Sequence, residues 1–296
     1  MTLSDNYQQL RAALVPGLAN PADPLALVRE KMHAVHPTDV PADATVTELA
    51  GFPVRSVSVQ TPQVKNRDSA VMMVHGGAFV STGIEHYIPY AAALSRFFHR
   101  PIVVFDYRLA PEHPFPAALH DSLNVYRRLL EIYDASRLAI IGDSCGGGIA
   151  LSLLCELREQ NIALPAAYAG LSPWLDLTMS GDAALNDTGD DPFVCAEWIR
   201  QRGRDYAAAM PLAHPQLSPL YADFHGLPPL YFATGGEDIT RDDARRAHQK
   251  ACAQNLVSEL DMPPHMIHGY HGLSALAPEC AAGCERIATF LNRYLD

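Results

Sequence analysis

Short apolar runs alternate with longer segments of helical periodicity from about residue 54 onward, and this alternation constrains the fold more than any other feature of the chain. The clearest apolar runs are 70–74, 102–107, 138–141 and 230–233. Segments 90–99, 118–133, 147–160 and 241–254 place apolar residues three or four positions apart, as amphipathic helices do. Because near-continuous apolar runs are typical of strands covered on both faces, the pattern predicts an α/β fold with a mostly parallel central sheet and helices on both faces.

Two segments do not fit this alternation. Residues 1–50 suggest two short helices broken by several prolines, and residues 179–215 begin polar and then turn helical over 196–210. An insertion that does not extend the sheet is a natural lid. We therefore predict that 1–50 is the N-terminal part of a lid, and that 51–296 is the main domain with 179–215 as a lid insertion. An N-terminal segment that only stabilises the domain remains the alternative.

The charge balance limits the partners. Lys and Arg number 22 against 33 Asp and Glu, so the net charge of −11 repels phosphate backbones and anionic lipid headgroups. We therefore expect neither nucleic acid nor a membrane as a partner. The first residues lack the apolar core of a signal peptide, and no stretch approaches the roughly 20 apolar residues of a membrane-spanning helix. These features predict a cytoplasmic protein.

The six cysteines lack the paired short spacings of a disulfide framework. We expect all of them to be reduced. Apart from Cys145, they are interpreted as small buried hydrophobic residues.

The strongest chemical signal is the string Gly142-Asp143-Ser144-Cys145-Gly146. It directly follows a predicted strand and opens a predicted helix, which is the context in which G-x-S-x-G forms a nucleophile elbow. Gly142 and Gly146 remove side chains that would collide in so tight a turn. Ser144 is thereby predicted to be the exposed nucleophile, above the positive end of the helix. Cys145 is a rival that we discount, because at that position the backbone N–H acts and the side chain points away.

A second loop, His75-Gly76-Gly77-Ala78-Phe79, follows the strand at 70–74. Glycines allow a backbone to approach a substrate carbonyl closely. We therefore predict an oxyanion hole formed by the N–H groups of Gly76, Gly77 and Cys145, with His75 shaping the loop.

These motifs together resemble those of the hormone-sensitive lipase family of α/β hydrolases, in its microbial esterase branch. The resemblance spans about residues 70–275 and rests on His75 to Phe79, Tyr107 to Glu112, Phe115 to Ala117, Gly142 to Gly147, Ser172 to Leu177, and Asp238 to Asp242. Two positions depart from the family pattern, because Ala78 stands where a third glycine is usual and Cys145 where alanine is usual.

The resemblance implies a serine carboxylesterase that hydrolyses short- to medium-chain esters, with no metal or organic cofactor. Residues 51–296 would then be its catalytic domain. A small-molecule ester is the expected partner, and the resemblance leaves a homodimer open.

The acid and the base of such a fold follow the serine in the chain. The strand at 230–233 leads into Glu237 and Asp238, which places carboxylates at the carboxyl edge of the sheet. Asp238 is the predicted acid, and its match to the family's D-x-x-x-D pattern supports it over Glu237. Asp242 and Asp243 fit better in the first turn of the next helix.

Three histidines, His265, His268 and His271, lie beyond the last predicted strand. His268-Gly269-Tyr270 resembles the family's H-G-F, so His268 is the predicted base. The spacing of three also suits metal ligands, but no carboxylate or thiol cluster completes such a site, and we predict no metal.

The resulting hypothesis is an acyl-enzyme on Ser144, formed with His268 as the base and Asp238 as its orienting acid. Because the same machinery can cleave lactones or amides, a specialised hydrolase remains the first alternative. A non-catalytic ligand-binding member of the fold is the second. Phe79, Trp174, Phe193 and Tyr206 are candidates for lining the substrate pocket, although aromatic residues also form ordinary core.

Overall fold

An eight-stranded sheet forms the centre of the computed structural model, which describes residues 3–14, 19–187 and 191–296. The strands lie in the order β1-β2-β4-β3-β5-β6-β7-β8. β1 and β2 pair antiparallel, as do β2 and β4, and the pairs from β4 to β8 are parallel. The strands are β1 (Thr45–Glu48), β2 (Ser56–Gln60), β3 (Ala70–Val74), β4 (Ile102–Phe105), β5 (Leu138–Asp143), β6 (Ala167–Leu171), β7 (Leu230–Ala233) and β8 (Ser258–Asp261).

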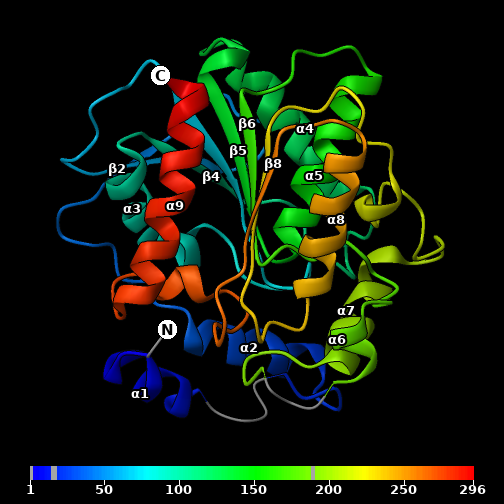
Figure 1. Cartoon of the computed structure of the whole chain (residues 1–296). Coiled ribbons are helices and arrows are strands. Elements are labelled where there is room, and N and C mark those ends of the chain that lie inside the picture. The colour runs from blue at the N-terminus through cyan, green and yellow to red at the C-terminus, as the bar shows by residue number, and fades with distance from the viewer. Residues whose placement is uncertain (1–2, 15–18, 188–190) are drawn as a thin grey trace.

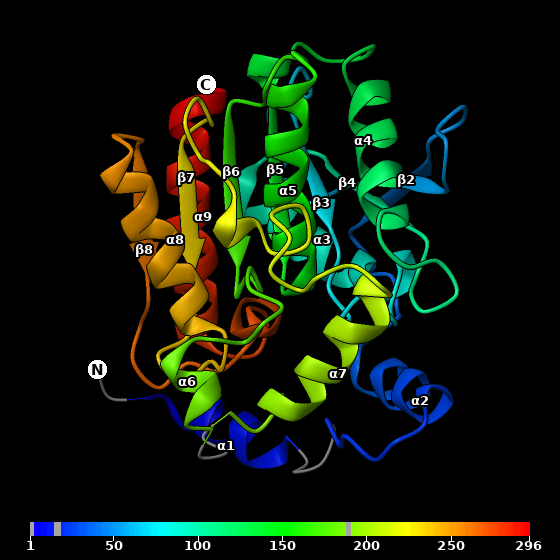
Figure 2. The same ribbon diagram turned by 90° about the vertical axis from the view of Figure 1, so that its right-hand side faces the viewer.

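Helices cover both faces of this sheet (Figures 1 and 2). One face carries α3 (Ile84–Phe98) and α9 (Pro278–Leu295), and the other carries α4 (Ala117–Leu129), α5 (Cys145–Glu159) and α8 (Arg241–Ala253). Alternate residues of β3 enter the two cores, with Met72 on the α4–α5 side and Met73 on the α3–α9 side. The predicted α/β architecture is confirmed.

Most predicted elements are found, with shifted ends. Residues 70–74 and 230–233 are strands as predicted, whereas 102–107 ends its strand at Phe105 and 138–141 continues to Asp143. The largest error concerns α3, which begins at Ile84 and not at residue 90. Pro89 lies inside this helix, where proline removes a backbone hydrogen bond. Burial of Ile84 and Ile88 outweighs that local cost.

Four helices lie together at the end of the sheet opposite the chain's C-terminus in both views (Figures 1 and 2). They are α1 (Asp5–Ala13) and α2 (Leu25–Val35) from the N-terminal segment, and α6 (Asp182–Leu185) and α7 (Ala196–Ala207) from the insertion. Parts of both segments, at 1–2, 15–18 and 188–190, fall outside the described residues. We call α1, α2, α6 and α7 the covering helices.

The end of the N-terminal segment differs from the prediction. Residues 45–48 form β1, which pairs with β2 and so extends the sheet. This part of 1–50 therefore belongs to the main domain. The described residues also form three short 3₁₀ helices, at Ala135–Arg137, Pro219–Tyr221 and Tyr270–Leu273. None of the helices in the described part of the chain has the length and apolar character needed to span a bilayer.

Cysteine placement follows the prediction only in part. All six thiols are free, and Cys155, Cys280 and Cys284 are buried. Cys252 is exposed and Cys195 is half-buried, so the interpretation of these two as buried hydrophobic residues was wrong. Both lie on or beside helices whose outer faces meet solvent, which the periodicity alone did not resolve.

Candidate active site

Ser144 occupies a sharp turn between β5 and α5. Its φ of 53° and ψ of −122° are unusual for a residue with a side chain, and such strain is typical of functional turns. The turn is held by the Ser144 N–H, which donates to the Leu171 carbonyl at 2.8 Å. The Ser144 carbonyl accepts from Trp174 N–H at 3.0 Å. The nucleophile is therefore fixed by backbone hydrogen bonds to the neighbouring strand β6 and the loop that follows it.

The flanking glycines are required by the tightness of this turn. A Cβ on Gly142 would lie 2.3 Å from the Gly146 carbonyl oxygen, and a Cβ on Gly146 would lie 2.2 Å from that of Val74. No real side chain fits at such distances. The elbow thus packs directly against the end of β3, where the loop His75 to Phe79 begins.

His268 and Asp238 converge on Ser144 from the loops after β8 and β7. The Ser144 Oγ lies 2.8 Å from His268 Nε2, and His268 Nδ1 lies 3.0 Å from Asp238 Oδ1. Asp238 is fully buried, and its carboxylate also accepts hydrogen bonds from Thr240 and from the Thr234 hydroxyl. The three predicted residues therefore form one continuous hydrogen-bonded chain.

The charges around these three residues favour an ion pair between His268 and Asp238. Burial by itself would raise the pKa of Asp238, but the charge of His268 and the hydrogen bonds that the carboxylate accepts hold the pKa well below its usual range. Burial would lower the pKa of His268, but the opposing charge of Asp238 raises it above its ordinary value, with help from Asp191 and Asp143. The site is arranged to stabilise an imidazolium next to Ser144.

The rival acids have other partners. Glu237 contacts the His265 ring at 2.8 Å and forms an ion pair with Arg11. Asp242 and Asp243 lie in the first turn of α8, as predicted. The Asp243 carboxylate accepts the N–H groups of Leu175 and Asp176, both at 2.9 Å, so it braces the loop after β6.

The two other histidines considered as the base, His265 and His271, do not contact Ser144 or Asp238. His265 is exposed beside Glu237, and the ring of His271 is buried against Tyr270 with their centroids 3.8 Å apart. Burial lowers the pKa of His271 to about 3, so its ring is neutral. The three rings therefore have different partners, and among the described residues no group of three or more His, Cys, Asp or Glu side chains is placed to hold a metal ion.

The glycine loop is arranged differently from the prediction. The Gly76 N–H donates to the Tyr87 hydroxyl at 2.7 Å, and that hydroxyl donates to Asp143 at 2.6 Å. An N–H already engaged in this way cannot bind an oxyanion, so the assignment of Gly76 as a donor was wrong. Gly77 and Ala78 are the loop residues that line the cavity beside Ser144.

The loop is also strained. Gly77, Ala78 and Phe79 have φ values of 98°, 53° and 67° in succession. For Ala78 and Phe79 this left-handed conformation costs about 1–2 kcal/mol per residue. Tertiary contacts must offset that cost, and His75 contributes by stacking on Tyr107 with their ring centroids 3.9 Å apart.

A cavity of about 410 Å³ opens onto Ser144 and His268. Its walls come from both the main domain and the covering segments. They include Leu14, Met32, Val35 and His36 from the N-terminal segment, Tyr87 and Tyr90 from α3, Phe193, Val194 and Trp198 from the insertion, and Leu273 and Leu276 after His268. This volume is within the lower part of the range typical of small-molecule sites.

Of the four aromatic candidates for this wall, only Phe193 lines the cavity among the described residues, with its ring stacked 6.4 Å from His268. The Phe79 ring packs against both Trp174 and Tyr206, with centroid distances of 5.2 Å and 3.9 Å, so these residues belong to the core. Trp198, which the sequence did not single out, lines the cavity instead.

Asp191 is a further residue that sequence reasoning missed. Its carboxylate accepts the backbone N–H of His268 at 2.9 Å and that of Phe193 at 2.9 Å. It is buried, and burial together with the nearby Asp238 raises its pKa. The only signal in the sequence is an Asp-Pro pair before a helix, which is equally typical of an ordinary turn.

Comparisons with known proteins agree with this geometry. Residues 71–272 match the family described as α/β-hydrolase fold. The chain is 32% identical to an acetyl-hydrolase of Streptomyces hygroscopicus over 75% of each chain. It superimposes with a TM-score of 0.91 on an esterase of the bacterial hormone-sensitive lipase family, at 29% identity over the whole of both chains. The crystal structure of EstE5 soaked with p-nitrophenyl butyrate gives a TM-score of 0.92 at 30% identity, over 99% of both chains.

The fold and the site together define a serine hydrolase. On the sequence and structural matches, the chain belongs to the α/β-hydrolase family, in its hormone-sensitive lipase branch, and it is a carboxylic ester hydrolase.

Proposed function

We propose that the protein hydrolyses short- to medium-chain carboxylic esters, with Ser144 as nucleophile, His268 as general base and Asp238 as the acid that orients it. The observation that carries this proposal is the hydrogen-bonded chain from Ser144 Oγ through the His268 ring to Asp238, facing a cavity of about 410 Å³. The acetyl-hydrolase and the esterase soaked with a butyrate ester support the short-chain range.

The mechanism follows from the positions of the protons. His268 Nε2 accepts the proton of Ser144 Oγ as the oxygen attacks the ester carbonyl. The negative charge then moves to the carbonyl oxygen, and the N–H groups of Gly77, Ala78 and Cys145 stabilise it. His268 returns the proton to the leaving alcohol, and the acyl group stays on Ser144.

Deacylation repeats these roles with water as the nucleophile. His268 takes a proton from the water, a second oxyanion forms in the same hole, and the carboxylic acid leaves with Ser144 protonated again. The buried Asp238 keeps the His268 ring in the required tautomer and stabilises its positive charge in both halves. No cofactor enters any of these steps.

The covering helices are proposed to be the lid of this site. Residues of α2 and α7 and of the segments next to them contribute much of the cavity wall, and Asp191 connects the insertion to the His268 loop. The lid thus shapes the space available to the acyl and alcohol groups, whereas the sheet carries the reacting groups.

The test is a set of initial rates on p-nitrophenyl esters from acetate to laurate with the wild type and Ser144→Ala. We expect wild-type rates that decline with chain length and a fall of about 10⁴-fold or more in Ser144→Ala. His268→Gln should lose activity as Ser144→Ala does. His265→Gln is its matched control, because His265 lies three residues away on the same loop with an exposed ring. Full activity of Ser144→Ala would overturn the proposal, and a preference for laurate would overturn the chain-length range.

A further inference from the structure

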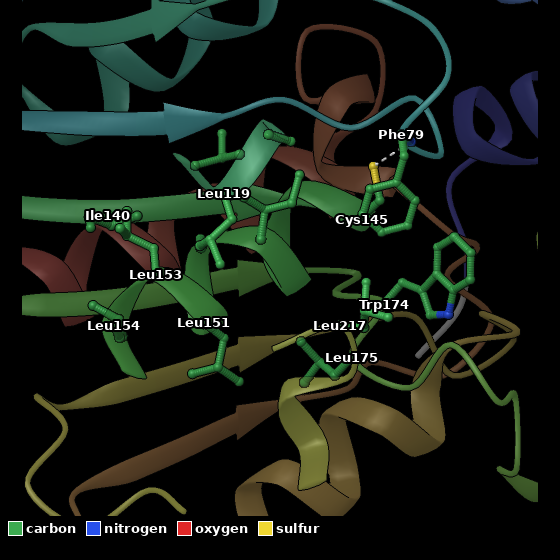
Figure 3. Packing of buried hydrophobic residues seen from close by; sticks show 14 of the residues in the cluster. Phe79, Leu119, Ile140, Cys145, Leu151, Leu153, Leu154, Trp174, Leu175 and Leu217 are labelled. Carbon is green, nitrogen blue, oxygen red and sulfur yellow. Dashed lines mark hydrogen bonds between the residues drawn. The ribbon is translucent and has the colours of Figure 1, made fainter. Parts of the chain in front are cut away.

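The side chain of Cys145 lies at the junction between the nucleophile elbow and the glycine loop. Cys145 is the first residue of α5 and is completely buried. Its Sγ accepts the backbone N–H of Phe79 at 3.2 Å, as the dashed line in Figure 3 shows. The thiol therefore joins the element that carries Ser144 to the loop that faces the oxyanion.

The thiol has a second partner on another strand end. Sγ lies 3.8 Å from the Tyr107 hydroxyl, which itself donates to the His75 carbonyl at 3.0 Å. Since the Tyr107 proton is used on His75, the Cys145 S–H is the donor to Tyr107. Burial raises the pKa of the Cys145 thiol to about 12, so it keeps the proton that this arrangement needs and does not act as a nucleophile.

The loop needs such a support because of its own sequence. Ala78 and Phe79 both adopt left-handed backbone conformations, and glycine is the residue that does so without strain. The family pattern usually has glycine at position 78 and alanine at 145, whereas this chain has Ala78 and Cys145. Cys145 contacts the N–H of Phe79, the residue that follows Ala78, so the thiol supports the strained turn directly next to the missing glycine.

We propose that the Cys145 thiol is a positioning group of the oxyanion hole, which holds Ala78 and Phe79 in the conformation that directs the loop N–H groups at the substrate. The inference rests on the oxyanion hole proposed above. The side chain acts through the loop, and it is distinct from the backbone N–H of Cys145, which any residue at this position retains. Truncating the side chain thus keeps the N–H groups of Gly77, Ala78 and Cys145 but makes their orientation toward the substrate less favourable.

The experiment compares Cys145→Ala with Cys145→Ser on p-nitrophenyl butyrate. Serine keeps one donor and one acceptor, and alanine has neither. We expect kcat of Cys145→Ala to fall about tenfold, less than for complete loss of an oxyanion donor, with KM changed less than about twofold. Binding of trifluoroacetophenone, whose adduct with Ser144 carries the oxyanion, should weaken by the same factor. Cys145→Ser should recover most of both losses.

Two further variants separate positioning from packing. Cys155→Ala removes another buried thiol of α5, away from Ser144, and should leave kcat unchanged. The double variant of Ala78→Gly and Cys145→Ala has the residue pair usual in the family. Its kcat should return toward the wild-type value, because glycine adopts the left-handed conformation at position 78 without support from the thiol. Equal losses of kcat in Cys145→Ala and Cys145→Ser would overturn the inference. So would an effect of Cys145→Ala on KM alone, or a double variant in which the effects of the two substitutions on kcat simply add. An active Ser144→Ala would instead overturn the proposed function itself.

Discussion

Two regions of the molecule are built in different ways. One is the end of the sheet that carries Ser144, Asp238 and His268, and the other is the set of covering helices. The sheet end is fixed by backbone hydrogen bonds and by glycines that admit no side chain, as at Gly142 and Gly146. The covering helices are attached by scattered side-chain contacts, such as the Tyr7 hydroxyl to the His265 carbonyl and Arg29 to the Val80 carbonyl.

This difference separates two tasks. The reacting groups must keep their geometry within a fraction of an ångström, and the sheet provides that rigidity. The cavity wall only needs to match the size and polarity of a substrate, and the covering helices can vary without disturbing the chemistry. The comparison therefore predicts large losses of rate from changes at the sheet end and changes of selectivity from the covering side.

The largest expected effect is at Asp238. Asp238→Asn keeps the shape of the side chain but favours the wrong tautomer of His268, so kcat should fall by about 10⁴-fold. Thermal unfolding and initial rates on p-nitrophenyl butyrate measure the two consequences separately. Glu237→Gln is the matched control and should lose little. Near-normal turnover of Asp238→Asn would mean that the sheet end does not carry the chemistry in the way proposed.

The pH dependence tests the charges around His268. His268 must be neutral to act as base, and its raised pKa should place the acid limb of kcat/KM above the ordinary histidine value of about 6.5. Activity is then lost as the pH falls through that raised pKa. An acid limb well below 6.5 would contradict the ion pair with Asp238.

Asp191 joins the two regions and should show an intermediate effect. Asp191→Asn removes a negative charge near His268, so the acid limb should move to lower pH. It also places an amide where three N–H groups now share one carboxylate, and kcat should fall about tenfold. Glu197→Gln, an exposed acid of α7, is the control. An unchanged acid limb in Asp191→Asn would show that the covering side has no electrostatic share in catalysis.

Trp198 should change selectivity more than rate. Trp198→Ala widens the cavity on the covering side, so the ratio of rates on laurate to butyrate should rise by about tenfold, while the rate on acetate stays within about threefold of the wild type. The p-nitrophenyl ester series measures this ratio directly. An equal loss of rate on every ester would contradict the division, because it would show that the covering side determines the catalytic rate and not the selectivity.

The smallest effect on rate is expected at Tyr7. Its hydroxyl donates to the His265 carbonyl and accepts from Ile267 N–H, and the side chain is buried. Tyr7→Phe should lower the free energy of unfolding by about 1–3 kcal/mol, because it leaves the buried N–H of Ile267 unpaired. Denaturant unfolding checks this value. A rate loss as large as that of Asp191→Asn would show that α1 also positions His268.

The sequence predicted much of the sheet end because its signals are local. The run before Ser144, the glycines around it and the helix after it define a turn whose geometry depends on adjacent residues. Asp238 and His268 followed from chain order and from matching short motifs. Gly76 was assigned wrongly because the partner that occupies its N–H, Tyr87, lies on α3, and only packing brings it there.

The covering side was predicted only in outline. The prolines and the broken periodicity indicated which segments leave the sheet, and β1 was missed because its four residues are mostly exposed on an edge. Neither Asp191 nor Trp198 carries a distinctive local signal. Their positions depend on where the insertion folds back over the sheet, which is a long-range property.

The sequence by itself determined the α/β class, the elbow at Ser144 and the order of acid and base, since each depends on periodicity or on a few neighbouring residues. The tertiary structure alone decided which loop N–H groups are free, which residues wall the cavity, and that the Cys145 thiol supports the turn at Ala78 and Phe79. These features arise where segments far apart in the chain meet, and hydrogen-bond partners across such contacts are set by packing and not by local sequence.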